Sequence, residues 1–433
     1  MADYRRKRRG ALKPIPKMKG KPVKKEELIK EAEVIAKNQT DTPKKQQQRK
    51  QEQQKQMRVV QGKKLKLQQQ FKTTAITISV VVLLIILLEI LLPAGIFETI
   101  ANGFTLIGKG GYPISLESSA TNNVISKGSY YYLLTNNSIE GYSAAGKKTF
   151  SYAHGFEKPV LKTSNKRALV FEQGGKRALI FTIRGLDKTI EAEEKIKNGA
   201  IGDDGTYAFI TSVTGYAAQV CVYEEGGENV YTWLSAKELV NNVAVAPSGK
   251  KIAVSTVTSS VGTYNSKVLV FNFKSSLPEY EKSYEDTVVY AIDTAFNSGF
   301  SVLTANEYNF IRWSNFKITQ YTNEYNTSMI RVGNNGVAVL YNRENDKTDN
   351  RIAIFSKNGK LKREIKFKGL INDFALKNNH IYCVSDTNAY ILSNEGSFMR
   401  KGECGFGVVR VCPIGQNSMA IFTDNSIDKI KLE

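Results

Sequence analysis

Residues 243–257 read VAVAPSGKKIAVSTV, and residues 267–273 read KVLVFNF. The first stretch contains two apolar runs separated by Pro247, Ser248 and Gly249, which favour a tight turn. Apolar runs of about four to eight residues that are rich in Val, Ile and Phe are typical of strands. An alternating segment, PEYEKSYED, follows at 278–286. This region therefore predicts four short antiparallel strands in succession.

The same unit recurs along residues 112–433. Its first turn returns at eight places, which are 127–128, 165–166, 204–205, 248–249, 298–299, 335–336, 378–379 and 415–416. Seven intervals separate Gly128 from Gln416, so the period is about 41 residues, as expected for a four-stranded propeller blade. We therefore predict an all-β fold, an eight-bladed β-propeller. Seven blades remain the alternative, if one weak copy is absorbed by its neighbours.

The eighth copy contains only three strand patterns, VVRVCP at 408–413, MAIFTD at 419–424 and SIDKIKLE at 426–433. The segment YPISLES at 112–118 precedes the first full copy and supplies a fourth strand. Pairing the first strand with the last would close the ring and remove two exposed sheet edges. We expect this N-terminal strand to complete the last blade.

The period and strand order resemble the β-propeller superfamily, including its WD-type and quinoprotein-type members. The Gly-His and Trp-Asp dipeptides of WD repeats are absent from the copies, as are the Trp-rich signatures of quinoprotein propellers. The resemblance therefore implies the fold over residues 112–433 and no activity. The layout of the whole chain also resembles an uncharacterised family of membrane-anchored propeller proteins of Gram-positive bacteria.

The positive charge of the chain is concentrated before the repeats. The chain carries a formal net charge of +20. Residues 1–72 hold 23 Lys and Arg against 7 Asp and Glu, which leaves only +4 for residues 73–433. A basic tail beside a nearly neutral propeller indicates an acidic partner for the tail and says little about the propeller.

Residues 73–92, TTAITISVVVLLIILLEILL, contain a single ionisable group, Glu89. At about 1.5 Å per residue, 20 residues span the hydrocarbon core of a bilayer. A core helix would show a polar stripe, and a cleaved signal peptide would have a shorter leader and a small-residue cleavage site. We predict one uncleaved transmembrane helix. The Lys and Arg residues before it place the N-terminus in the cytoplasm and the C-terminal part outside the plasma membrane.

The expected divisions of the chain are a basic, largely disordered tail at 1–72, the helix at 73–92, a linker at 93–111 and the propeller at 112–433. The sharpest basic cluster of the tail is Arg5, Arg6, Lys7, Arg8 and Arg9. Because the tail would be tethered beside the inner leaflet, anionic lipid headgroups are its expected partner. Nucleic acid is disfavoured, since no zinc-finger spacing, glycine-rich RNA motif or aromatic platform accompanies the basic residues.

No pattern in the sequence points to catalysis or to a cofactor. The chain has two histidines, His154 and His380, and lacks H-E-x-x-H, C-x-x-C, G-x-S-x-G and phosphate-binding loops. We expect no catalytic residue, no metal and no cofactor. Cys404 and Cys412 lie eight residues apart, and a disulfide between them is left open, since spacing does not establish geometry.

Two connections between second and third strands are long, at 258–266 and 342–350. We expect both to be loops, because polar and turn-forming residues dominate them. The first exposes Tyr264 for stacking. The second offers Glu344, Asp346 and Asp349 for a cation or a basic partner. Solvated loops without a ligand remain the alternative for each.

The predicted function is a membrane-anchored, extracytoplasmic binding or scaffold module without enzymatic activity. Its partner would be a protein or a polymer of the cell envelope. Two alternatives remain open. One is a surface carbohydrate-active enzyme that uses pairs of Asp and Glu on the propeller face. The other is a membrane sensor that couples binding outside the cell to the cytoplasmic tail.

Overall fold

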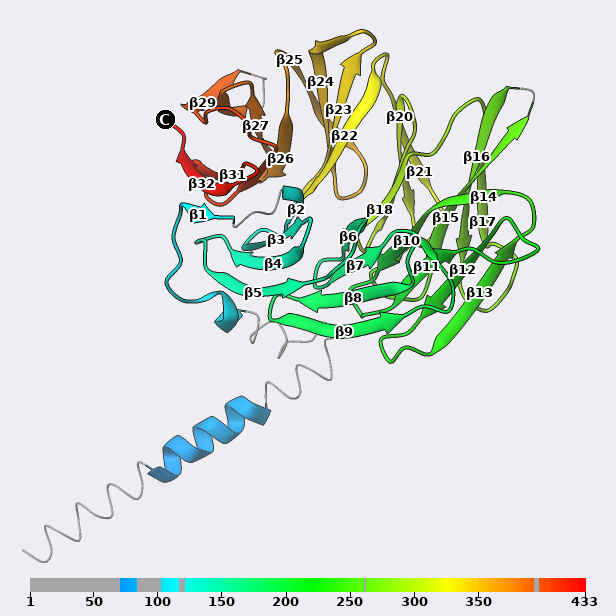
Figure 1. The fold of residues 1–433 in the computed structure, drawn as a ribbon, viewed down its shortest axis with the longest axis horizontal. Helices are drawn as coiled ribbons and strands as arrows, with labels where there is room; N and C mark the ends of the chain where they lie inside the picture. The colour runs from blue at the N-terminus through cyan, green and yellow to red at the C-terminus, as the bar shows by residue number, and fades with distance from the viewer. Residues whose placement is uncertain (1–70, 84–102, 117–120, 261, 393–396) are drawn as a thin grey trace, which may run out of the picture. The chain divides into compact units, whose positions relative to one another are not determined.

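The computed structural model describes residues 71–83, 103–116, 121–260, 262–392 and 397–433. From Ile114 onward, these residues form eight four-stranded antiparallel sheets. We call the sheets blades and number them in chain order, from blade 1 (β2 to β5) to blade 8 (β30 to β32 with β1), as Figure 1 shows. The predicted eight-bladed propeller is confirmed.

The strands are short, and their bounds follow the chain. Blades 1 to 4 contain β2 (Thr121–Ser126), β3 (Tyr130–Thr135), β4 (Ser138–Ser143), β5 (Lys148–Ala153), β6 (Pro159–Thr163), β7 (Ala168–Glu172), β8 (Arg177–Thr182), β9 (Gly185–Glu191), β10 (Ile196–Ile201), β11 (Tyr207–Thr211), β12 (Ala218–Tyr223), β13 (Asn229–Ser235), β14 (Leu239–Val245), β15 (Ile252–Ser260), β16 (Thr263–Phe271) and β17 (Tyr280–Tyr284). Blades 5 to 8 contain β18 (Ala291–Phe296), β19 (Gly299–Leu303), β20 (Glu307–Arg312), β21 (Ile318–Thr322), β22 (Asn326–Gly333), β23 (Gly336–Arg343), β24 (Asp346–Ser356), β25 (Leu361–Lys368), β26 (Asp373–Lys377), β27 (His380–Ser385), β28 (Asn388–Leu392), β29 (Phe398–Glu403), β30 (Arg410–Pro413), β31 (Ser418–Phe422), β32 (Ser426–Lys431) and β1 (Ile114–Ser115).

The turn residues seen in the sequence occupy the turns of the structure. In blade 4, Gly249 between β14 and β15 has a φ of 67°, which a residue with a side chain rarely adopts. In blade 7, Asn378 and Asn379 both have positive φ, 49° and 65°, and Lys377 pairs directly with His380. Two central residues with positive φ make the tight turn that matches the twist of a hairpin. The turn residues therefore determine where each of these strands ends.

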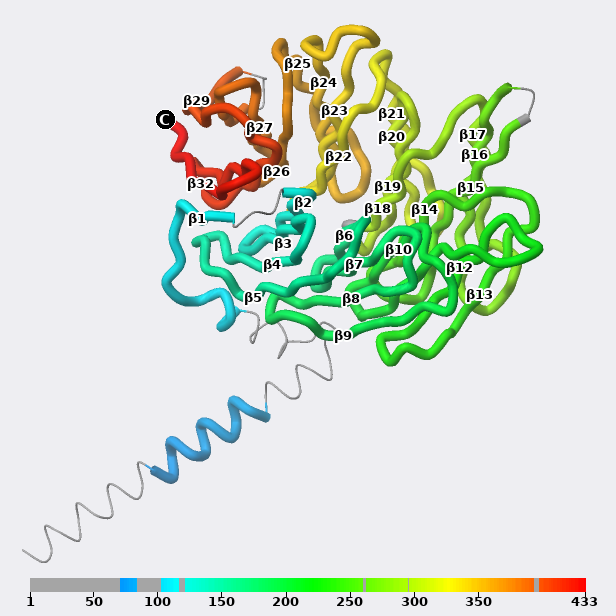
Figure 2. The backbone as a smooth tube through the Cα atoms, viewed as in Figure 1, coloured from blue at the N-terminus to red at the C-terminus, as the bar shows by residue number. Residues whose placement is uncertain are grey.

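Blade 8 is completed by the first strand of the propeller, as predicted. β1 pairs antiparallel with β32, with Ile114 opposite Ile427 and Ser115 opposite Ser426. Figure 2 shows that these two segments, which are far apart in sequence, lie side by side. The rings of Tyr131 in blade 1 and Phe422 in blade 8 meet edge to face, 5.3 Å apart. The first and last blades are therefore in direct contact, and the ring is closed.

Eight hydrophobic clusters hold the blades together, and each joins neighbouring blades. For example, Val220 and Tyr231 of blade 3 pack with Val254 and Phe271 of blade 4. The core is thus a ring of interfaces between blades rather than one central core. The inner strands are left to line the middle of the ring.

The two connections expected to be loops are continuations of strands, so that prediction is wrong. β15 and β16 run on as a ladder to the pair Ser260 and Thr263, and β23 and β24 pair as far as Arg343 and Asp346. Thr258, Thr263 and Tyr264 of the first connection are residue types that fit a pleated strand, although the segment looks loop-like by polarity. Both connections are long two-stranded hairpins.

The chain divides into two compact units, residues 1–97 and 98–433. In the first unit, the described residues 71–83 form an α-helix. The predicted transmembrane helix at 73–92 lies only partly within the described residues, and Arg5 to Arg9 lie outside them. Among the described residues, no helix has both the length and the apolar composition that crossing a membrane requires.

In the second unit, the expected linker is attached to the propeller at its described end. Residues 103–106 form one helical turn. Lys147, in the turn between β4 and β5, donates its Nζ to the carbonyl oxygens of Thr105, at 2.8 Å, and Ile107, at 2.6 Å. The residues that lead into β1 are therefore fixed to blade 1.

Candidate functional site

The two long hairpins lie on one face of the ring. In blades 1 to 7 the inner strand comes first, and in blade 8 the inner strand β30 precedes β31 and β32, so the connections from the second strand outward to the third all leave the same face. β15 and β16 are nine residues each, and β23 and β24 are eight and eleven. Their blades, 4 and 6, flank blade 5. We call this side the hairpin face.

Tyr264 lies near the tip of the first hairpin. It is on β16 opposite Ser259, and 58% of its surface is exposed. One residue further along, Asn265 accepts a 3.0 Å hydrogen bond from the backbone N–H of Asp286 through its Oδ1. The hairpin base is therefore tied to the connection between blades 4 and 5, while the tyrosine ring is free to stack on a ligand.

The three acidic residues of the second hairpin do not converge on one point. Glu344 is exposed in the turn. Asp346 accepts hydrogen bonds from the backbone N–H and the hydroxyl of Thr348, at 2.9 and 2.7 Å, and these bonds lower the pKa of its carboxyl. Asp349 lies on β24, where Arg343 contacts it at 3.1 Å through Nε and Arg351 at 3.5 Å through Nη1.

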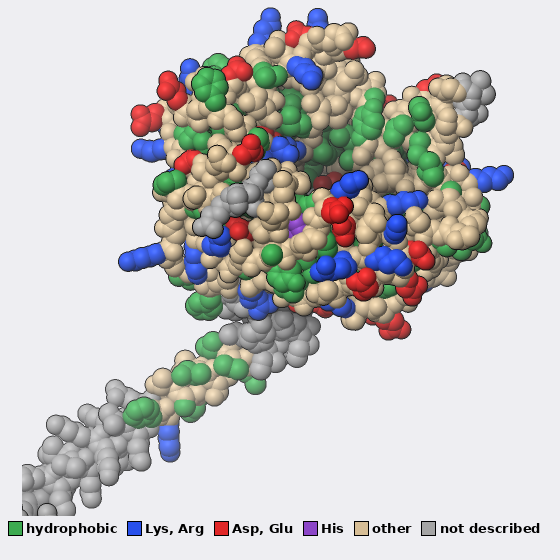
Figure 3. Space-filling model, in the orientation of Figure 1, with side chains coloured by type: hydrophobic (Ala, Val, Ile, Leu, Met, Phe, Trp, Pro, Cys, Tyr) green, Lys and Arg blue, Asp and Glu red, His purple; other side chains and the backbone are tan. Residues whose placement is uncertain are grey.

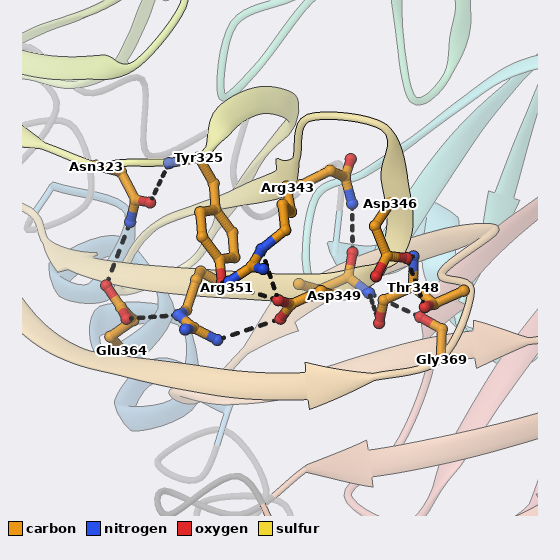
Figure 4. Close-up of polar contacts among 11 residues, drawn as sticks. Asn323, Tyr325, Arg343, Asp346, Thr348, Asp349, Arg351, Glu364 and Gly369 are labelled. Atoms are coloured by element: carbon orange, nitrogen blue, oxygen red, sulfur yellow. Dashed lines mark hydrogen bonds and ion pairs between the residues drawn. The ribbon is translucent and has the colours of Figure 1, made fainter.

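Asp349 belongs to a cluster of paired charges at the base of this hairpin (Figure 4). The hydroxyl of Tyr325 donates to Asp349 at 2.9 Å, and both guanidinium groups lie over the Tyr325 ring, at 5.4 Å for Arg343 and 4.6 Å for Arg351. Arg351 also contacts Glu364 at 3.4 Å. The carboxylate of Asp349 is thus already neutralised within the blade. In the described part of the chain, no three His, Cys, Asp or Glu side chains are grouped to hold a metal ion.

A second candidate, which the sequence did not reveal, is the central channel. All eight inner strands line a cavity of about 550 Å³. Figure 3 shows a hollow near the middle of the propeller, with basic and acidic side chains around it. The charged residues of the lining are Lys127, Lys162, Asp293, Arg331, Asp373 and Lys377. Four basic groups against two carboxylates leave the channel positive.

One wall of the channel, formed by blades 6 to 8, has its charges paired. Arg331 of β22 forms an ion pair with Asp373 of β26, which is 2% exposed. The other oxygen of Asp373 accepts a 2.9 Å hydrogen bond from the backbone N–H of Val411 in β30. Lys377 donates its Nζ to the carbonyl oxygen of Pro413 at 3.2 Å. These contacts link three successive blades.

The wall formed by blades 1 and 2 differs. Lys127 follows β2 and Lys162 lies within β6, and among the described residues neither ammonium group has a hydrogen-bond or ion-pair partner. Burial lowers the pKa of both lysines, and the charge of Asp293, on β18 of blade 5, partly offsets this for each. In a ring of eight blades, blade 5 lies opposite blade 1. Asp293 therefore acts on both ammonium groups from across the channel, and Asp203 acts on Lys127 as well.

His154 is held by two hydrogen bonds in the described propeller, and the cysteines are unbridged. The Nε2 of buried His154 donates to the carbonyl oxygen of Thr135 at 3.2 Å, and its Nδ1 accepts from the backbone N–H of Phe156 at 3.0 Å. All four cysteines are free, so Cys404 and Cys412 form no disulfide. Burial raises the pKa of Cys412 to about 11, which keeps this thiol protonated at neutral pH.

The propeller is similar to several solved structures. BamB from Moraxella catarrhalis matches with 11% identity and a TM-score of 0.47, over 74% of this chain and 96% of that chain. The C-terminal WD40 domain of Sif2 matches with 8% identity and a TM-score of 0.52, over 75% of this chain and the whole of that chain. At 8% identity, the likeness to the Sif2 domain shows the β-propeller fold alone.

Comparisons at the level of sequence give one family and no characterised relative. A comparison with curated proteins finds no match. A family of unknown function matches residues 111–432, which include every strand of the propeller. The geometry of the molecule must therefore carry any functional argument.

Proposed function

The chain belongs to the DUF5711 family, a family of unknown function, and we propose that its propeller is a binding module whose hairpin face holds a protein or an envelope polymer. The observation that carries this proposal is the length of two hairpins on one face. Between Val257 and Ser266, the first hairpin adds exposed residues, among them Ser259, Thr263 and Tyr264. Ordering the backbone of such residues costs roughly 1 to 2 kcal/mol of conformational entropy each, and their exposed side chains gain no burial within the propeller that would offset this cost. Burial against a bound partner would offset it.

The hairpins and the space between them suit a large partner. They rise from blades 4 and 6 and leave blade 5 between them, so an elongated or bulky ligand could contact both. Tyr264 offers an aromatic surface on one side, and Glu344 offers a carboxylate on the other. The paired cluster around Asp349 would hold the second hairpin in place without itself binding the ligand.

Site-specific photo-crosslinking in intact cells tests this proposal. A photoreactive amino acid at Tyr264 or Glu344 is expected to capture the same partner. The matched control is Lys250, which is exposed in the turn between β14 and β15 on the opposite face. Capture from Lys250 equal to that from the hairpins, or no capture from either hairpin, would contradict the assignment.

We also propose that the module is anchored in the plasma membrane, with the propeller outside the cell. The support is the apolar composition of residues 73–92 and the basic residues before them. In the described helical part, apolar side chains point to solvent, among them Ile76 at 62% and Leu83 at 66% exposure. Anionic lipid headgroups would bind the basic tail.

The topology can be tested with a thiol reagent that does not cross membranes. We expect the reagent to label Lys250→Cys in intact cells and Lys63→Cys only after the membrane is opened. The native cysteines replaced by Ala provide the background. Labelling of Lys63→Cys in intact cells, or protection of Lys250→Cys, would overturn the orientation.

A further inference from the structure

Two lysines of the central channel carry charge that the described protein leaves unpaired. Lys127 and Lys162 come from the neighbouring blades 1 and 2, and both line the cavity of about 550 Å³. Each is only partly exposed. Partial loss of water without a protein partner is unfavourable for an ammonium group, so an anion in the cavity would stabilise both lysines.

The other charged groups of the cavity do not supply the missing partners. Arg331 and Asp373 are paired with each other, and Lys377 donates to Pro413. The charge of Asp293 acts on both lysines, and that of Asp203, in the turn after β10, acts on Lys127. Asp203 already accepts hydrogen bonds from Asn165, at 2.6 Å from the backbone N–H and 2.8 Å from Nδ2. The wall of blades 1 and 2 therefore retains positive charge.

The size and shape of the cavity limit what could neutralise it. A water molecule occupies about 30 Å³ in the liquid, so the cavity has room for a small multi-atom ligand and the water around it. The lining includes the turns after the inner strands, Gly128, Ser164 and Asn334 among them. These turns lie on the face opposite the hairpin face. Access from that side would not require the hairpins to move.

We propose that the central channel is a binding site for a small oxyanion, a phosphate or carboxylate group, held by Lys127 and Lys162. Charge-assisted hydrogen bonds from both ammonium groups would provide the binding energy. Burial lowers the pKa of both lysines, and a bound anion would raise it, because the anion would favour their charged forms. The site is separate from the hairpin face and stands whether or not that face binds a partner.

The test measures binding of two probes to the full-length protein by isothermal titration calorimetry. Inorganic phosphate represents the phosphate source and citrate the carboxylate source. We expect saturable binding of one of them, with one site per chain. Lys162→Met and Lys127→Met should each weaken it by about tenfold or more, as loss of one charge-assisted bond implies. Lys366→Met, which changes an exposed lysine on β25, should bind as the wild type does.

Thermal unfolding without a probe separates loss of the site from loss of the fold. Removing an unpaired charge should leave Lys162→Met at least as stable as the wild type, so weakened binding by a stable variant supports the proposal. Three results would overturn it. These are no saturable binding of either probe, equal affinity of the wild type and both channel variants, and binding of an acidic peptide in place of both probes.

Discussion

The two walls of the central channel both carry charged side chains and yet differ in how they hold that charge. On the side of blades 6 to 8, Arg331 and Asp373 are paired, and Asp373 also binds the backbone of blade 8. On the side of blades 1 and 2, Lys127 and Lys162 face the cavity without partners among the described residues. Paired charge joins blades to one another, whereas unpaired charge is available for a ligand.

The base of the second hairpin supports the same distinction. Asp349 lies in a segment that the sequence suggested as a cation site, but two arginines and Tyr325 already bind it. An acidic residue in a long connection is therefore a poor sign of a binding site until its partners are known. Paired and unpaired charged residues should therefore respond differently to substitution.

The largest expected effect is unfolding at alkaline pH. Burial raises the pKa of Tyr112, Tyr223 and Tyr231 to about 12, and it also raises the pKa of Tyr131 and Tyr308. Unfolded tyrosine loses its proton near pH 10, so the stability that these groups contribute is complete below pH 10 and is lost as the pH rises toward 12. Circular dichroism and tyrosinate absorbance should therefore change together.

The channel lysines change the unfolding free energy in the opposite direction over this pH range. Because the pKa of Lys127 and Lys162 is lowered in the folded state, their contribution to stability rises as the pH rises toward 10.5, the ordinary lysine value. The buried tyrosines are more numerous than the two lysines, so we expect the unfolding free energy to fall as the pH rises. Full ionisation of tyrosine near pH 10 with the sheets intact would show that the tyrosine side chains are not buried as described.

Asp373→Ala should produce the next largest effect. The change leaves the Arg331 guanidinium and the backbone N–H of Val411 without their acceptor. Loss of one partner of a buried pair costs about 3 to 5 kcal/mol of unfolding free energy. Chemical denaturation measures it, with the exposed Asp424→Ala as the control. Equal midpoints for the two variants would contradict the structural role of the paired wall.

Asp349→Ala and Asp346→Ala form a matched pair within one hairpin. The first leaves two arginines and Tyr325 without their acceptor and should cost about 1 to 3 kcal/mol. The second removes only two exposed hydrogen bonds from Thr348 and should cost less. Thermal unfolding of the two variants compares them directly. A larger loss for Asp346→Ala would argue against the cluster in Figure 4.

Lys162→Met should have the smallest effect on stability, with the opposite sign. Replacing an unpaired ammonium with an apolar side chain of similar length should raise the unfolding free energy by up to about 1 kcal/mol, since no partner is left without its contact. Differential scanning calorimetry without added anions measures the change. A clear loss of stability would show that the lysine is paired, and the contrast between the walls would fail.

The fold could be predicted because its signals are local. Each blade can be recognised in the sequence by a turn, such as Ser248 with Gly249, that has an apolar strand on either side. The missing strand of blade 8 could be assigned to residues near Ile114 because a closed ring needs it. The two long hairpins were misjudged because polarity alone does not separate a solvent-exposed strand from a loop.

The channel could not be predicted because its contacts depend on closure of the ring. Lys127 and Asp293 are in blades on opposite sides of the ring, and no local pattern relates them. A weaker signal was available. Charged residues such as Lys162 and Arg331 interrupt apolar inner strands, where a side chain facing a neighbouring blade would be apolar. The partners of Asp349 also required the strand pairing, which brings Arg343 beside it.

The most direct test of the contrast is to titrate the channel lysines themselves. Isotope-labelled dimethyl-lysine in the full-length protein can be followed by NMR as a function of pH, with Lys127 and Lys162 assigned by Arg replacement. We predict that Lys127 and Lys162 lose their protons below pH 10.5, the ordinary lysine value, and that a bound oxyanion raises the pH at which they do so. Titration of both lysines at the ordinary value, unchanged by phosphate or citrate, would contradict the account.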